Sequence, residues 1–178
     1  MQAIHKIQYF LYILLITLFS CSDDRKNRPE EKKANLKEPL IRINKYLIEK
    51  DAEAIESYVK RRNWNMTVTE TGLWYMIYKK GSGKKAEKGK IATLYYKVNL
   101  LDGTLCYSSD SINPKRFKIG QGGVESGLEE GILFLRQGDK ARFIIPPHLA
   151  HGLLGDEDKI PSRSIIVYDI ELLNISDY

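Results

Sequence analysis

The sequence predicts an α+β fold in which an antiparallel β-sheet wraps over one short helix. After residue 64, apolar and polar residues alternate over several segments, which is the pattern of half-buried strands. An Asp-Gly pair at 102–103 separates two of these segments and marks a hairpin turn. Within this part of the chain, the segment 125–135 has apolar residues at helical spacing. Several strands interrupted by one helix favour the α+β class.

The 178 residues, 43% of them hydrophobic, suffice for one globular domain with additional segments. We divide the chain into a signal segment at 1–21, a disordered tether at 22–38, a helical lead-in at 39–64 and the main domain at 65–178. The net charge of +5 arises from 28 basic and 23 acidic residues, which are interleaved rather than gathered in a stripe. We therefore expect no nucleic-acid partner.

The signal segment decides the expected compartment. Its apolar run IQYFLYILLITLFS is short for a membrane span but has the length of a signal h-region. The ending Leu-Phe-Ser-Cys resembles a bacterial lipobox, which implies that Cys21 carries lipid and becomes the new N-terminus. The expected location is then the cell envelope outside the cytoplasm, at the outer membrane, on its periplasmic face or on the surface. The alternative is an uncleaved anchor helix in which Cys21 is incidental.

The segment 22–38 is polar and charged, which is typical of a disordered tether that holds a domain away from a membrane. Pro39 suits the first turn of a helix, and Asp51 suits the cap of a second helical segment. Apolar residues recur along both segments: Ile41, Ile43, Leu47, Ile48, Ile55, Tyr58 and Val59. We expect a helix that packs against the main domain, with a dimer-forming helix as the alternative.

The main domain lacks the common catalytic motifs. It has no Walker loop and no His-Glu-x-x-His motif, and the glycine-rich GQGGVESG does not follow a long buried strand. His148 and His151 lack a third ligand at useful spacing, so we expect no metal and no cofactor. Glu129 and Glu130 are expected to face solvent opposite the apolar face of the helix. If Cys21 is acylated, Cys106 has no disulfide partner, and we interpret it as a small buried hydrophobe.

A chain without nucleophile, base or metal is either a binding module or the catalyst of a reaction that needs none of these. Prolyl isomerisation is such a reaction, because its barrier of roughly 20 kcal/mol is the loss of amide resonance on twisting. A dry pocket lined by aromatic side chains favours the twisted amide, which is less polar. One or two hydrogen bonds then hold the peptide.

Four blocks carry a family resemblance: YYKVNLLDGTLCYSS, FKIGQGGVESGLEEGI, GDKARFIIPPHLAHG and IPSRSIIVYDIELL. In this order and spacing, over about residues 72–174, they resemble the FKBP-type peptidyl-prolyl cis-trans isomerases. The resemblance implies an FKBP-like bent antiparallel sheet around one short helix, with the pocket between them. With its lipoprotein signal and helical lead-in, the sequence is most similar to the gliding-motility-associated FKBP-type lipoproteins of Bacteroidetes.

The resemblance also implies the site. By position, the residues expected to act on the twisting amide are Tyr96, Tyr107, Leu128, His151 and Tyr168. Those expected to line the substrate site are Cys106, Phe117, Val124, Glu125 and Ile160. The sequence departs from the family at the hairpin, where Phe-Asp has become Cys106-Tyr107, and restoring Phe-Asp should raise turnover. Glu125 replaces an apolar Ile, and His151 replaces a Tyr that hydrogen-bonds the peptide carbonyl.

These residues imply a prolyl isomerase and folding helper whose partners are X-Pro-containing polypeptides of the envelope or the secreted fraction. The membrane would be contacted through lipid on Cys21, and binding of an FK506-like macrolide is a further possibility. Two alternatives stay open: a non-catalytic FKBP-like chaperone or assembly subunit of an envelope machine, and a lipoprotein in which the fold is only structural.

Overall fold

The computed structural model describes residues 29–109 and 112–177. The signal segment, Cys21 and the first part of the expected tether lie outside the described residues. The chain divides into two units after Lys45, within helix α2. The helices are α2 (Pro29–Arg61), α3 (Ser126–Ile132) and the short 3₁₀ helix η2 (Pro147–Leu149). The strands are β1 (Thr67–Val68), β2 (Trp74–Lys79), β3 (Ile91–Leu100), β4 (Leu105–Ser108), β5 (Lys115–Lys118), β6 (Lys140–Ile145) and β7 (Ile166–Ser176).

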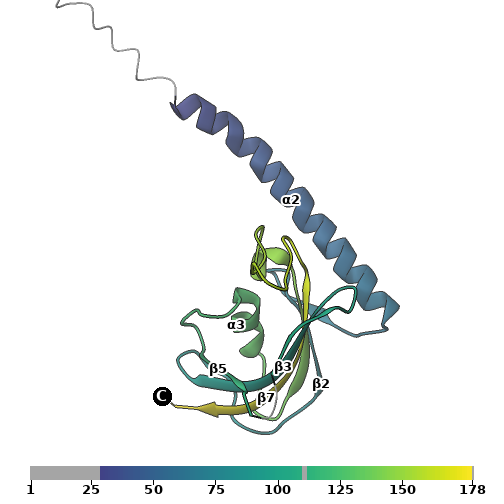
Figure 1. Cartoon of the computed structure of the whole chain (residues 1–178), viewed down its shortest axis with the longest axis vertical. Helices are drawn as coiled ribbons and strands as arrows, with labels where there is room; N and C mark the ends of the chain where they lie inside the picture. The colour runs from purple at the N-terminus through teal and green to yellow at the C-terminus, as the bar shows by residue number, and fades with distance from the viewer. Residues whose placement is uncertain (1–28, 110–111, 178) are drawn as a thin grey trace, which may run out of the picture. The chain divides into compact units, whose positions relative to one another are not determined.

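The strands form one antiparallel sheet in the order β1-β2-β6-β7-β3-β4, and β5 pairs with β3 beside β4. The long strands β3 and β7 pair along their whole length, from Leu100 opposite Ile166 to Ile91 opposite Ser176. The sheet bends around α3, which lies against its concave face (Figure 1). The predicted α+β fold is therefore confirmed. Strands β4 and β5 both pair with β3, which pairs with β7 on its other side.

The main core lies between α3 and the sheet. The three apolar residues at helical spacing, Leu128, Ile132 and Leu135, are fully buried together with Phe143 and Tyr168 of the sheet. The helix lies close to β6 because it presents Gly131 there: a Cβ at this position would lie 2.6 Å from Cε2 of Phe143. This close approach fixes the position of α3 and, with it, one wall of the candidate site.

We expect the substitution Gly131→Ala to destabilise the protein by about 1–3 kcal/mol. Alanine favours a helix by about 1 kcal/mol over glycine, but here its methyl group would collide with the Phe143 ring in a packed core. Chemical denaturation followed by tryptophan fluorescence measures the difference. A gain in stability would instead mean that the ring moves aside at little cost.

The second core lies on the other face of the sheet. Ile55, Tyr58 and Val59 of α2 are buried against Ile144 of β6 and Val167 of β7. Four residues before Ile55 in α2, Asp51 accepts hydrogen bonds from Arg163 at both of its carboxylate oxygens, each at 3.0 Å. This part of α2 therefore packs against the sheet, as expected for the lead-in.

Two expectations about the N-terminal helix were wrong. The helix begins at Pro29, so residues 29–38 are helical rather than a disordered tether, and Pro39 lies inside the helix. Strong helix formers (Glu, Lys, Ala and Leu) fill this segment and outweigh the single backbone hydrogen bond that Pro39 removes. The helix is also continuous through Asp51, whose carboxylate pairs with Arg163 instead of capping a second segment.

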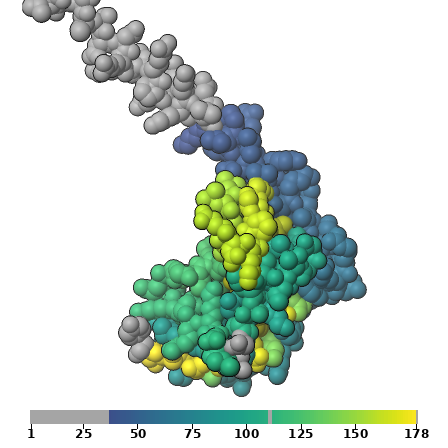
Figure 2. Space-filling view, in the orientation of Figure 1, coloured from purple at the N-terminus to yellow at the C-terminus, as the bar shows by residue number. Residues whose placement is uncertain are grey.

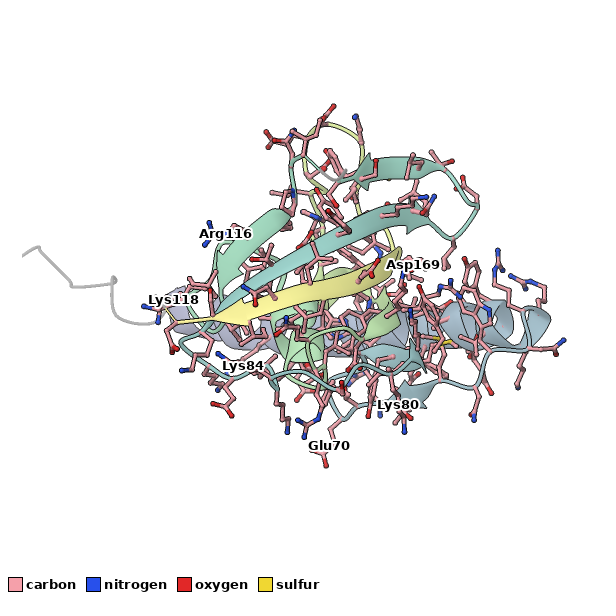
Figure 3. The ribbon with its side chains drawn as sticks, turned by 90° about the horizontal axis from the view of Figure 1, so that it is seen from below. Glu70, Lys80, Lys84, Arg116, Lys118 and Asp169 are labelled. Carbon is pink, nitrogen blue, oxygen red and sulfur yellow. The ribbon has the colours of Figure 1, made fainter. Side chains whose placement is uncertain are left out.

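Basic side chains gather at the end of the sheet where β7 finishes. Lys84, Arg116 and Lys118 point outward there (Figure 3). The register agrees, because Lys118 and Ser176 both lie opposite Ile91. Among residues 29–109 and 112–177, no helix combines the length and the apolar character that a membrane span requires.

Candidate active site

The structure gathers the predicted pocket residues at the concave side of the sheet. Leu128 of α3, Tyr168 of β7 and Phe117 of β5 are buried in the main core, as are Cys106 and Ile160. Three further predicted residues, Tyr96, Tyr107 and Val124, are partly buried against that core. The rings of Tyr96 and Tyr168 lie 5.9 Å apart between centroids. The apolar floor that the resemblance implies is therefore present.

A carboxylate lies over this floor. Glu125 immediately precedes α3, and its side chain is only 10% exposed. Its Oε1 accepts a hydrogen bond from the Tyr168 hydroxyl at 2.8 Å and lies 3.2 Å from Nε2 of His151. Its Oε2 is buried and has no hydrogen-bond partner among the described residues. Glu125 thus places a buried carboxylate where the family resemblance implies an apolar residue.

The tyrosines respond to this carboxylate. Burial, and then the charge of Glu125 and the hydrogen bond to it, raise the pKa of Tyr168 far above its usual range. Burial also raises the pKa of Tyr96, with a further contribution from Glu125. Both phenols therefore stay neutral at physiological pH and act as hydrogen-bond donors or apolar surfaces.

The neighbouring pocket has a volume of about 390 Å³ and opens between β5, the loop that leads into α3 and the loop after η2. Its lining is Lys115, Gly123, Val124, Glu125, Ala150 and His151. The ammonium of Lys115 lies 5.2 Å from the centre of the Tyr96 ring and 4.0 Å from Oε2 of Glu125. The Nε2 of His151 faces Glu125, so this nitrogen is already engaged rather than free to donate to a bound peptide.

The altered hairpin forms the second part of the site. The Tyr107 hydroxyl donates to Oδ2 of Asp156 at 2.5 Å and lies 3.2 Å from Oδ2 of Asp158. Cys106 is 4% exposed, and its thiol lies 3.5 Å from the carbonyl oxygen of Lys159. The strand β4 thus fastens the long loop before β7, which appears in yellow-green beside the teal hairpin in Figure 2.

These contacts decide the chemistry of the hairpin. Burial raises the pKa of the Cys106 thiol, with contributions from Asp156 and Asp102, which opposes a nucleophilic role. The expected buried hydrophobe is confirmed by its position in the core. For Asp156, burial works to raise the pKa, but hydrogen bonds from Tyr107 and from the backbone of Ile160 and Asp158 outweigh it and lower the pKa to about 2.

We expect the contribution of this contact to stability to disappear in acid. Because the pKa of Asp156 is lower in the folded chain than its ordinary value of 3.8, its ionised form stabilises the fold above about pH 4, and this is lost as the pH falls toward 2. The variant Tyr107→Phe should therefore have a lower Tm than the parent protein at pH 7. The difference should shrink between pH 4 and pH 2. A constant difference over that range would contradict a role for the Asp156 carboxylate.

The structure corrects the interpretation of two acidic residues. Glu129 and Glu130 are half-buried rather than directed to open solvent. Glu129 accepts the backbone N–H of Gly122 at 2.9 Å, and Glu130 accepts the hydroxyl of Thr71 at 2.7 Å. Both therefore fasten loops to α3, which the helical periodicity alone could not indicate.

The two loop histidines serve different contacts. His148 Nε2 lies 2.9 Å from the carbonyl oxygen of Thr71, whereas His151 faces Glu125. Within the described ranges, no three His, Cys, Asp or Glu side chains gather closely enough to hold a metal ion.

Sequence reasoning missed Lys115, Asp156 and Asp158 as parts of the site. Lys115 begins β5 two residues before Phe117, so strand alternation places both side chains on the same face. That spacing was an available signal for Lys115. No such signal existed for Asp156 and Asp158, because their partner Tyr107 lies about fifty residues away in the chain.

Comparisons with known proteins agree with this geometry. The family model described as FKBP-type peptidyl-prolyl cis-trans isomerase matches residues 82–173. The chain belongs to this family. A probable FKBP-type peptidyl-prolyl cis-trans isomerase FkpA of Neisseria meningitidis serogroup B is 33% identical over 148 residues, covering 74% of this chain and 54% of the relative. FK506-binding protein 2 of Dictyostelium discoideum is 40% identical over 93 residues, covering 52% of this chain and 70% of the relative.

The crystal structure of AtFKBP13 is 31% identical, with a TM-score of 0.59 over 62% of this chain and 98% of that one. The FKBP-like fold is therefore confirmed. The chain spans about half the length of the FkpA relatives, 54% for Neisseria and 49% for Aeromonas hydrophila. The cleft of this FKBP domain differs from the apolar cleft that the resemblance implies. It contains a cluster of polar side chains: Glu125, Tyr168, His151 and Lys115.

Proposed function

We propose that the protein is a peptidyl-prolyl cis-trans isomerase that assists the folding of X-Pro-containing polypeptides. The observation that carries this proposal is the buried floor of Leu128, Phe117 and Tyr168 beneath Tyr96, inside an FKBP fold. Twisting an X-Pro amide breaks no bond and moves no proton, so walls that exclude water and hold the peptide are sufficient. Uncatalysed isomerisation takes tens to hundreds of seconds, which is slow enough to limit folding.

The test is the rate of cis/trans exchange of short X-Pro peptides, measured by NMR with the full-length chain in mild detergent. We expect exchange to accelerate in proportion to protein concentration. An FK506-like macrolide that fills the cleft should suppress the acceleration, and this also tests macrolide binding. Unaccelerated exchange in the presence of a folded sample would reject the proposal.

We further propose that the clients are envelope or secreted proteins and that lipid on Cys21 anchors the chain outside the cytoplasm. The support is the sequence LFSC after an apolar run of signal length. The wider resemblance to gliding-motility-associated lipoproteins of Bacteroidetes favours a role in that machinery. Cys21→Ser should release the protein from the membrane fraction, whereas retention would favour the uncleaved anchor helix.

A second candidate is a non-catalytic chaperone or assembly subunit. It is favoured by the polar group in the cleft and, separately, by the exposed side chains of Leu40, Ile41 and Ile43 on α2. Such a protein would bind unfolded clients and suppress their aggregation without accelerating exchange. An aggregation assay run beside the exchange measurement distinguishes the two functions.

A further inference from the structure

The carboxylate of Glu125 is incompletely satisfied. Its Oε1 has two partners, Tyr168 and His151, but Oε2 is buried without a hydrogen bond among the described residues. A buried charged oxygen without a donor is costly, and native structures almost always supply a partner from the protein, from water or from a ligand. Because Glu125 lines the open pocket beside α3, a bound molecule can supply that partner.

The nearest lysine does not hydrogen-bond Oε2 of Glu125. Lys115 is the nearest ammonium that the structure describes, and its Nζ lies 4.0 Å from Oε2, which is beyond hydrogen-bonding distance. The side chain of Lys115 is 26% exposed and lies over the ring of Tyr96 at the pocket wall. A long flexible side chain in this position can move aside at small cost, and a second cation can then approach Glu125.

The loop that follows His151 adds negative charge near the cleft. Asp156, Glu157 and Asp158 follow one another in the loop that Tyr107 fastens to β4, and Lys159 is the one base among these four residues. This loop begins beside His151, which lines the pocket, and the N–H of Arg163 closes it by donating to the carbonyl oxygen of Gly152 at 3.0 Å. The loop precedes β7, whereas Lys84, Arg116 and Lys118 lie where β7 ends (Figure 3). Between His151 and Arg163, the loop thus carries three acids and one base.

We propose that the cleft selects polypeptide segments that carry lysine or arginine beside the proline, with Oε2 of Glu125 accepting a hydrogen bond from the cationic side chain. This inference rests on the proposed function, because it names the substrate class of the same cleft. The apolar floor receives the proline ring, and the carboxylate discriminates among the neighbouring side chains. A charge-assisted hydrogen bond in a partly buried site typically changes affinity by about tenfold.

The experiment compares two peptide pairs with the full-length chain. In each pair, lysine or norleucine stands directly before or directly after the proline, so that the members differ in charge but not in stem length. Both the dissociation constant and the exchange rate are measured. We expect about tenfold tighter binding and a similarly higher kcat/KM for the lysine peptide of one pair.

Three variants test the residue assignment. Glu125→Gln keeps the size and removes the charge, so the preference for lysine should vanish while norleucine peptides still bind. Lys115→Met removes the competing ammonium, so the preference should increase by roughly threefold. Glu87→Gln, the same chemical change in the loop between β2 and β3, should leave the preference unaltered. If Glu125→Gln fails to fold, the opposite sign expected for Lys115→Met still tests the proposal.

The possible outcomes separate the two proposals. Equal binding of lysine and norleucine peptides, with exchange accelerated, overturns the inference and leaves the isomerase function intact. A lysine preference that survives in Glu125→Gln also overturns it. A preference that depends on Glu125 without any acceleration of exchange supports the inference for a binding cleft and rejects the isomerase function.

Discussion

Replacing Asp139 by alanine is expected to lower the free energy of unfolding by about 3 kcal/mol. Asp139 is 3% exposed, and its two oxygens accept separate backbone hydrogen bonds, from Gly81 at 2.6 Å and from Arg136 at 2.7 Å. Its removal leaves two donors without their acceptor in an interior position, and each such donor costs about 1–3 kcal/mol. The segment before β6 would also lose one of its hydrogen bonds to the loop after β2.

Urea denaturation of Asp139→Ala measures this effect, and two variants serve as controls. Asp139→Asn retains one acceptor oxygen and should lose about half as much stability. Asp102→Ala removes an exposed aspartate that accepts the N–H of Thr104 in the hairpin turn, so its effect should be small. If Asp139→Ala were no less stable than Asp102→Ala, water would have to replace the carboxylate at both donors.

The second large effect concerns the hairpin. Restoring Phe-Asp, as Cys106→Phe with Tyr107→Asp, is expected to destabilise the protein. The loss of folded protein would then oppose any gain in turnover. Cys106 is packed in the core, and enlarging it to phenylalanine costs about 1–3 kcal/mol. The new aspartate would lose the hydrogen bond of Tyr107 and would lie beside Asp156 and Asp158, where a third negative charge is repelled.

Thermal unfolding and limited proteolysis test this expectation together. The double variant should have a lower Tm than the parent, and cleavage should shift to the loop between η2 and β7. Tyr107→Phe is the matched control, because it loses the hydroxyl without adding charge and should lose less stability. A double variant as stable as the parent, with higher turnover per folded molecule, would show that the loop can repack around Phe-Asp.

Most of the main domain could be predicted from the sequence. Alternation located β3, β6 and β7, the pair at 102–103 located the hairpin, and helical spacing placed Leu128 and Ile132 on the buried face of α3. These features could be predicted because each depends on the period of side-chain burial within one element. The four family blocks then identified the residues that meet at the cleft, including Tyr96 and Tyr168.

The contacts among those residues could not be predicted and are seen in the folded structure alone. Glu125 acquires its character from Tyr168 and His151, which lie 43 and 26 residues away, and from Lys115 across the pocket. Tyr107 likewise meets Asp156 at a separation of 49 residues. Periodicity reports whether a side chain is buried but not which partner it meets there, because partners are chosen by the packing of distant segments. The hydrogen bonds and ion pairs of the cleft therefore depend on the folded chain rather than on any one motif.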